Sequence, residues 1–97
     1  MRAVTHGDVV AAARAIRAMP RAARRGAVMG MLERAHAADR FRKRFGRAHP
    51  LWGNGSLMAV ALPSRGERGE PFPSDPGHLD AMATVIEAIL AWRQRLP

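Results

Sequence analysis

The fold is decided by residues 21–46, RAARRGAVMGMLERAHAADRFRKRFG. At 100° per residue, the apolar side chains of this run gather on one broad side, and the basic side chains of its second half gather on the other. Pro20 marks its start, Gly46 is a stop signal, and Pro50 prevents any continuation. The run predicts one long amphipathic helix that ends at Phe45 or Gly46. Its apolar side comprises Ala27, Met31, Ala35, Ala38, Phe41 and Phe45.

Gly26 and Gly30 lie inside this predicted helix and weaken it by about 1 kcal/mol each relative to alanine. They are four residues apart, so they share one face of the helix. The pair therefore also allows a neighbouring helix to approach this face closely.

A second main helix is predicted before this run, over residues 5–19. Thr5 and Asp8 form a capping-box-like pair at its start, and Val4 and Val9 occupy the two positions of a hydrophobic staple. Apolar residues then recur at helical spacing and predict a core-facing side. They are Val9, Ala12, Ala13, Ile16 and Met19.

The third main helix is predicted at the C-terminal end, capped by Ser74 or Asp75 with Pro76 in its first turn. Its apolar face is expected to meet the core, while Trp92 and Leu96 can instead stay exposed as contacts with a partner or a second copy. That face comprises Leu79, Met82, Val85, Ile86, Ile89, Trp92 and Leu96.

Turn-forming residues separate these helices. The connector 49–56 is followed by a short helix, which Asn54 or Ser56 caps and Pro63 ends. Residues 63–75 form a polar loop. The chain has no internal repeat and no strand pattern. We therefore predict a single all-α domain over residues 1–97, with three main helices and one short helix in an orthogonal or bundle-like array.

Composition excludes several kinds of site. The chain has no cysteine, so neither a disulfide framework nor a thiolate metal site can form. No run approaches the roughly 18 to 20 apolar residues of a membrane span. The basic N-terminal segment fits a domain helix better than a targeting segment. We expect a cytoplasmic protein with no membrane contact.

Catalytic and metal-binding patterns are also incomplete. His36 and Asp39 are one helical turn apart and His49 lies downstream, but no further ligand completes a metal site. The serines lie outside any nucleophile-elbow motif, and no pair of carboxylates stands out for acid–base work. We predict no metal, no cofactor and no enzymatic activity. A small enzyme would need a pocket lined by His36, Asp39 and His49.

Positive charge is concentrated in the first half of the chain. Residues 1–50 contain twelve Lys and Arg against three acids, whereas residues 51–97 contain four against five. Arginine supplies all but one of the basic residues, and the codon bias of a high-GC bacterial genome accounts for part of that excess. A basic half beside a nearly neutral half indicates a polyanionic partner.

Four of these cations follow i, i+3, i+4, i+7 spacing, so they share one helix face. Like charges this close repel one another, but together they can follow a row of phosphates. An acidic protein partner and a merely solvated face are the alternatives. No Asn or Gln accompanies the four, and no helix-turn-helix pattern is evident, which favours sequence-tolerant binding. The predicted phosphate contacts are Arg40, Lys43, Arg44 and Arg47, with Arg21, Arg24 and Arg25 assisting.

Trp52 stands between a proline and a Gly-Asn-Gly turn and has two interpretations. It is an exposed stacking platform for a base, or it folds back to seal the core where two helices meet, which we favour. The turn lacks the spacing and the lysine of a phosphate-binding loop. With a protein partner, Trp52, Phe72 and Trp92 would form an exposed anchor patch. The predicted partner or oligomer contacts are Trp52, Trp92 and Leu96.

Three stretches, residues 5–8, 37–57 and 71–76, resemble a family of short, uncharacterised alphaproteobacterial proteins. In size, helicity and charge, the chain is similar to the small terminase subunit of a phage-derived gene transfer agent. That resemblance implies a DNA-packaging adaptor that assembles as a homo-oligomer, holds double-stranded DNA loosely and hands it to a large motor subunit, with no catalytic residue. Many small terminases carry a recognisable helix-turn-helix, and this chain does not, which counts against the resemblance. Loss of sequence-specific DNA reading is a hypothesis that would explain the departure.

Two hypotheses follow. The first is a non-enzymatic, sequence-tolerant adaptor for double-stranded DNA. The second is a protein-interaction or regulatory module whose basic face binds an acidic protein partner.

Overall fold

The computed structural model describes residues 2–64, 66, 69 and 71–95. They form α1 (His6–Ile16), α2 (Arg21–Phe45), α3 (Leu57–Ala61) and α4 (Pro76–Arg95), with a 3₁₀ turn, Leu62–Ser64, after α3. Extended pairing in the described ranges amounts to one isolated bridge between His49 and Gly53. The prediction of an all-α fold with three main helices and one short helix is confirmed.

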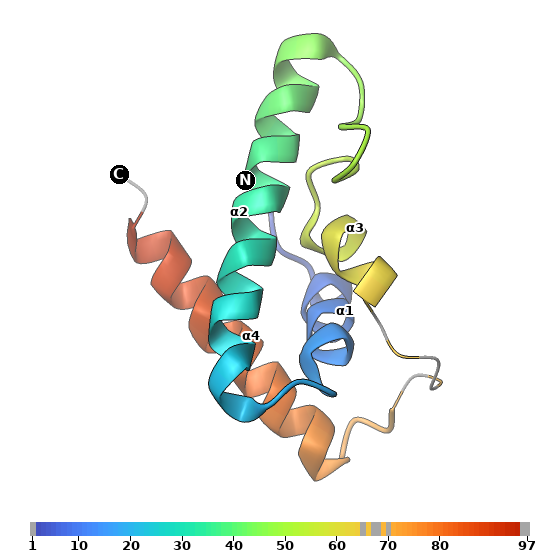
Figure 1. Ribbon diagram of the computed structural model, residues 1–97, viewed down its shortest axis with the longest axis vertical. Coiled ribbons are helices and arrows are strands. Elements are labelled where there is room, and N and C mark those ends of the chain that lie inside the picture. The colour runs from blue at the N-terminus through green and yellow to red at the C-terminus, as the bar shows by residue number, and fades with distance from the viewer. Residues whose placement is uncertain (1, 65, 67–68, 70, 96–97) are drawn as a thin grey trace.

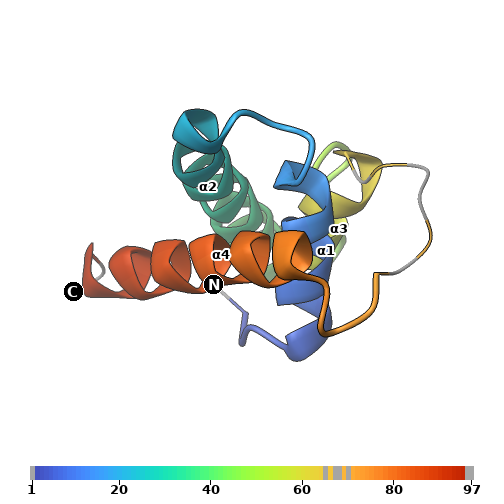
Figure 2. The same ribbon diagram turned by 90° about the horizontal axis from the view of Figure 1, so that it is seen from below.

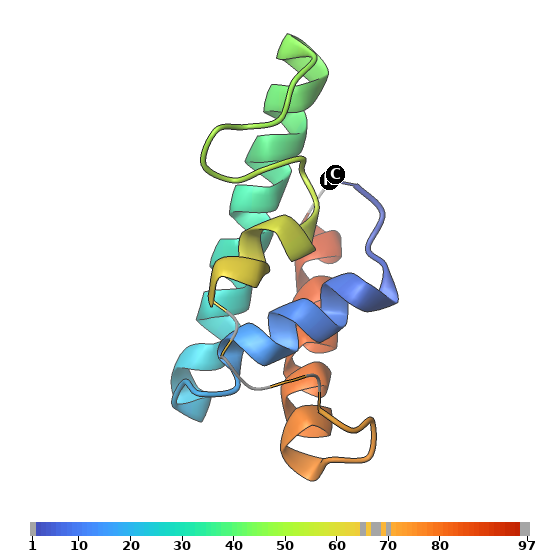
Figure 3. The same cartoon turned by 90° about the vertical axis from the view of Figure 1, so that its right-hand side faces the viewer.

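The helices form a crossed array with α1 at its centre. Helix α1 packs against both α3 and α4, and α2 also contacts these two helices. Figure 3 shows α1 and α3 lying across α2 and α4, and Figure 2 shows α1 crossing α4. In Figure 1 the C-terminal end of α2 extends past the other helices, and the connector 46–56 returns beside it. This protruding end carries Arg40, Lys43 and Arg44 of the predicted phosphate contacts, and the connector after it carries Arg47.

The core lies where the four helices meet, and its large side chains come from all of them. The largest apolar side chains without exposed surface are Ile16, Val28, Leu32, Leu57 and Val85. Buried alanines on α1, α2, α3 and α4 surround them. Because alanine has a small side chain, the helices can approach one another closely, and the core needs few aromatic residues.

Asp8 connects the start of α1 to the start of α3. Its Oδ2 accepts a hydrogen bond from the backbone N–H of Thr5 at 2.8 Å, and the Thr5 hydroxyl accepts one from the Asp8 N–H at 3.2 Å. The predicted capping box is therefore confirmed. The other oxygen, Oδ1, accepts from the backbone N–H of Met58 at 2.9 Å. One buried carboxylate thus caps two helices.

Helix α2 begins and ends as its flanking residues predict. Pro20 is its N-cap, and Gly46 ends it in the left-handed region at φ 70°, with its N–H bonded to the Arg42 carbonyl at 2.8 Å. The interpretation of Gly26 and Gly30 as a close-packing pair is wrong. A Cβ at Gly26 would meet nothing within 4 Å, and one at Gly30 would meet only the Arg34 side chain at 3.8 Å.

Gly26→Ala should therefore stabilise the protein, since the site is open and helical. We expect the free energy of unfolding to rise by about 1 kcal/mol, which raises the melting temperature by about 4–8 °C in a domain of this size. Thermal unfolding followed by circular dichroism measures this shift. An unchanged or lower melting temperature would contradict the open environment of Gly26.

Helix α4 buries a different side from the one predicted. Its buried residues include Val85, Ile89 and Trp92, as expected, but also His78 and two alanines. Leu79 and Ile86, which were predicted to face the core, are 49% and 46% exposed. The helix is apolar around most of its circumference, so periodicity alone could not identify the buried side.

Candidate nucleic-acid interface

The candidate interface is built from the last turns of α2 and the connector 46–56. Gly46 ends the helix, and the chain then turns back through Gly53 and Gly55, both at positive φ. His49 and Gly53 exchange two backbone hydrogen bonds of 2.8 and 3.0 Å. The His49 Nδ1 also accepts from the backbone N–H groups of Leu51 and Trp52. These bonds fix the connector as a compact turn beside the end of α2.

Asp39 attaches this turn to α2. A Cβ at Gly55 would lie 2.7 Å from the Cα of Asp39, so the two backbones are in direct contact. The Asp39 side chain is buried and is paired with Lys43 at 3.0 Å and with Arg42 at 3.2 Å. Burial raises the pKa of Asp39, but the hydrogen bonds from Lys43 and Arg42 outweigh it and bring the pKa below its usual value. Asp39 is therefore a charged anchor within the fold.

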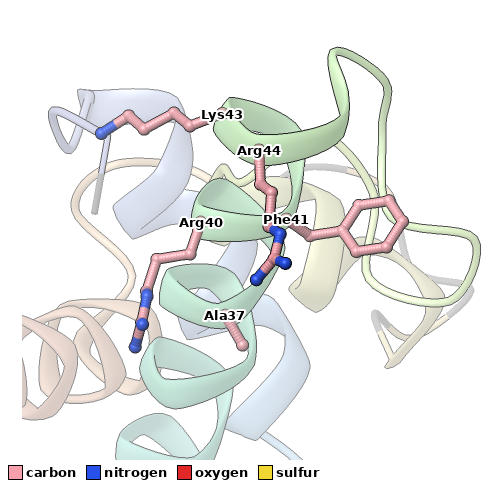
Figure 4. A pocket seen from close by; sticks show the side chains of 5 residues that line it. All are labelled: Ala37, Arg40, Phe41, Lys43 and Arg44. Atoms are coloured by element: carbon pink, nitrogen blue, oxygen red, sulfur yellow. The ribbon is translucent and has the colours of Figure 1, made fainter.

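The cationic stripe comprises Arg40 and Arg44 on the exposed side of the last turns of α2, and Arg47 in the connector just after Gly46. The prediction that Arg47 shares their helix face is wrong, because Gly46 ends the helix before it. All three side chains are exposed, and within the described residues none of them forms an ion pair. Figure 4 shows Arg40 and Arg44 running back along the helix, with Lys43 and Phe41 diverging to either side. A shallow hollow of about 590 Å³ lies among Ala37, Arg40, Phe41, Lys43 and Arg44. Lys43 also belongs to the predicted set, but its ammonium group is paired with Asp39.

An aromatic cluster borders the stripe, and the sequence did not predict it as a unit. The Phe41 ring lies 4.6 Å from Phe45 and 4.9 Å from His49, and His49 stacks on Trp52 at 4.6 Å with 7° between the planes. The guanidinium of Arg44 lies 5.5 Å from the Phe45 centroid, and that of Arg47 lies 6.0 Å from Phe41. Such contacts hold the arginines over the cluster without neutralising them.

Phe41 and Phe45 were assigned to the core face of the helix, and this was wrong for Phe45, which is 54% exposed. The spacing of four residues between two phenylalanines at a helix end, just before a glycine stop, was the signal that could have revealed the cluster. Beyond the other helices there is no core for Phe45 to enter.

The three arginines at the start of α2 have different environments: two of them bond to other parts of the fold, and one is exposed. Arg24 donates to the carbonyl oxygens of Arg17 at 2.8 Å and Met19 at 3.1 Å, and its side chain is only 14% exposed. It secures the α1–α2 turn and cannot meet a phosphate without breaking these bonds. Arg21 pairs with Asp80 at 2.9 Å. Arg25 is exposed on the surface, far along α2 from the stripe.

The predicted partner contacts do not form one surface. Trp92 is 5% exposed and packs in the core, so its prediction as an exposed contact is wrong. Trp52 is half-buried against His49 rather than in the core cluster of the described residues, so the favoured interpretation as a core seal is wrong as well. Leu96 lies outside the described residues. An anchor patch of Trp52, Phe72 and Trp92 is not formed, because Trp92 is buried.

The three residues that an enzyme would need do not share a pocket. His36 packs edge-on against Trp92 at 5.9 Å, Asp39 contacts Gly55, and His49 stacks on Trp52. Among the described residues, no group of three His, Asp or Glu side chains is placed to hold a metal ion. No described helix is both long and apolar enough to cross a membrane.

His36 gives the fold a pH dependence. Burial, followed by nearby positive charges that include Arg40, lowers the pKa of His36 below 6.5. The unfolded chain therefore takes up this proton at a higher pH than the folded chain. The free energy of unfolding should fall as the pH drops through 6.5 towards the lowered pKa. We expect His36→Gln to show a smaller fall between about pH 7 and about pH 5 in urea titrations. An equal fall in both proteins would exclude His36 as the source.

The comparisons with known proteins give a family without an assigned function. A family model described as "Domain of unknown function (DUF7742)" matches residues 2–89. No curated protein and no solved structure matches the chain. The match spans α1, α2, α3 and most of α4, and so includes the cationic stripe and its connector. The chain therefore belongs to the DUF7742 family.

Proposed function

We propose that this protein is a non-enzymatic, sequence-tolerant adaptor for double-stranded DNA, which it contacts through the cationic stripe. The observation that carries the proposal is that Arg40, Arg44 and Arg47 are exposed and make no ion pair within the described part of the chain. They project from a helix end that extends past the rest of the fold (Figure 1). A phosphate backbone can therefore approach them without steric conflict.

The dimensions of the stripe suit a phosphate backbone. From Arg40 to Arg44 it spans about 6 Å along the helix axis, a length over which duplex DNA carries about three or four phosphate charges, and Arg47 follows in the connector. Cations at a helix C-terminus also interact favourably with the helix dipole, by about 0.3–1 kcal/mol each. The dipole favours positive charge at this end, but it does not require three exposed arginines there.

The fold makes little use of these arginines, whereas it uses their neighbours. Asp39 is buried and anchors the connector, and Gly55 contacts its backbone. The arginines of the stripe touch only the exposed edge of the aromatic cluster. These arginines all carry positive charge, and the fold does not need them. We therefore expect them to bind a ligand.

We further propose that the adaptor serves in DNA packaging. The support is the resemblance to the small terminase subunit of a gene transfer agent, together with a stripe suited to holding DNA without reading its sequence. In that role the protein would assemble as an oligomer and pass DNA to a large motor subunit.

An acidic protein partner is the second candidate, and one observation favours it. Phe45 and Leu51, 54% and 80% exposed, lie at the same end of the molecule as the arginines. Exposed apolar and arginine side chains together are typical of protein interfaces. This candidate predicts negligible affinity for DNA.

Fluorescence anisotropy with two duplexes of unrelated sequence tests the proposal. We expect the logarithm of the affinity to fall linearly with the logarithm of the salt concentration, by the same slope for both duplexes. No binding at low salt would contradict DNA binding and favour the acidic protein partner. Strong preference for one duplex would contradict sequence tolerance.

Two single variants distinguish the members of the predicted set. Arg44→Gln should reduce the magnitude of the salt slope by about 1, the effect of losing one phosphate contact. Lys43→Gln should reduce it less, because Asp39 already neutralises part of the Lys43 charge. Equal reductions in the same titration would mean that Lys43 leaves Asp39 to bind phosphate.

A further inference from the structure

The outer side of α4 carries an apolar seam. Leu79, Ile86 and Leu90 are 49%, 46% and 56% exposed, and Ala83 is exposed between them. With Arg93, they follow alternating spacings of four, three, four and three residues. This is the heptad pattern of a helix that packs against another helix. The opposite side of α4 is buried against α1 and α2, so the seam is not part of the core.

We propose that a second copy of this chain docks on the seam, with the two α4 helices packed antiparallel and Ile86 facing Ile86 of the other copy. The described residues of the chain itself leave these side chains exposed, and a row of exposed apolar residues on one helix face marks an interaction surface. Ala83 is small enough to let the two helix axes approach closely.

Charge selects the direction of the second copy. The acidic residues of α4, Asp80 and Glu87, lie in its first two thirds, and the basic residues, Arg93 and Arg95, lie in its last turn. Arg93 is exposed and has no ion pair among the described residues of its own chain. An antiparallel copy brings Arg93 opposite the turn that contains Leu79 and Asp80, whose carboxylate already pairs with Arg21 and Arg24 of its own chain. A parallel copy would bring Arg93 opposite Arg93, so like charges would meet.

The antiparallel arrangement also opposes the two helix dipoles, which a parallel arrangement would align. The seam is short compared with the surface of about 800 Å² per partner in a standard stable interface. We therefore expect a dimer that dissociates on dilution.

Single cysteine variants test both the contact and its direction, because the chain has no cysteine of its own. Under mild oxidation by copper phenanthroline, Ile86→Cys should form a disulfide-linked dimer. Leu79→Cys should not, because the two copies of this position would lie about 21 Å apart along the helix axes, beyond the reach of a disulfide. Linkage of both variants would overturn the antiparallel arrangement. Linkage of neither would overturn the contact itself.

Sedimentation velocity over about 1 to 500 µM protein gives an independent reading. The wild type should shift from monomer to dimer over this range, whereas Ile86→Glu should stay monomeric with an unchanged circular dichroism spectrum. Leu51→Glu, on a leucine that is more exposed than Ile86 and lies away from the seam, is the control and should dimerise like the wild type. A wild type that stays monomeric throughout, or a Leu51→Glu that loses the dimer, would overturn the proposal.

Discussion

Gly55→Ala is expected to lower the free energy of unfolding by about 3 kcal/mol. Gly55 has φ 94°, and a left-handed residue with a Cβ costs about 1–2 kcal/mol. The new Cβ would also lie 2.7 Å from the Asp39 Cα and 2.8 Å from its Cβ. Neither atom belongs to a flexible side-chain end, so the connector must shift away from α2, and such overpacking adds about 1–3 kcal/mol.

Urea unfolding of Gly55→Ala beside Gly46→Ala separates the two contributions. Gly46 also has a positive φ, but a Cβ there would meet nothing within 4 Å, so Gly46→Ala should lose only the backbone cost of about 1–2 kcal/mol. Losses of equal size in the two variants would contradict the close contact between the connector and Asp39.

Asp8→Ala is expected to cost a similar amount, about 3 kcal/mol. Loss of the bonds that the Asp8 carboxylate accepts from the Thr5 N–H and hydroxyl accounts for about 1 kcal/mol, while the Thr5 hydroxyl still accepts from the backbone N–H of residue 8. The backbone N–H of Met58 would also lose its acceptor in a half-buried position, which adds about 1–3 kcal/mol. Both helix starts should loosen together, because one carboxylate serves them both.

Ser56→Ala is the control for Asp8→Ala in the same denaturation experiment. The Ser56 hydroxyl accepts from the Ala59 N–H at 3.1 Å and caps α3 alone, so its loss should cost only about 1 kcal/mol. If Asp8→Ala cost no more than Ser56→Ala, Asp8 would not link the two helices as described.

Local signals carried most of the fold prediction. The start of α1 at Thr5 and the end of α2 at Gly46 were predicted from residues within one helical turn of each boundary. Such caps depend on neighbouring backbone groups alone, so a sequence reveals them directly. The helical composition of the fold follows from the same short-range patterns.

Contacts between residues far apart in the chain could not be predicted. Asp39 read as a candidate for an enzyme pocket because nothing in the sequence shows that Gly55 packs against its backbone. Its pairs with Arg42 and Lys43, at i,i+3 and i,i+4 spacing, could have been predicted. Arg24 was predicted to contact phosphate because the sequence does not show its bond to the Arg17 carbonyl, which lies on the other side of the α1–α2 turn. Trp92 was placed both on the predicted core face and among the partner contacts, because α4 is apolar on nearly every side.

The candidate site was therefore predicted in part. Helical spacing alone placed Arg40 and Arg44 on one face, and the structure leaves them exposed. Arg47 is also exposed, but it lies in the connector after the end of the helix. The aromatic cluster beside them depends on the connector turning back onto α2, so it could be seen only in three dimensions.

The salt dependence of DNA binding in two charge-matched double variants tests the central claim most directly. One variant changes Arg40 and Arg44 to glutamine, and the other changes Arg34 and Arg95, which lie outside the stripe on α2 and α4. We predict that the first variant reduces the magnitude of the salt slope by about 2 and that the second leaves it close to that of the wild type. Equal slopes in the two variants would show that binding follows net charge alone and would contradict a DNA contact at the stripe.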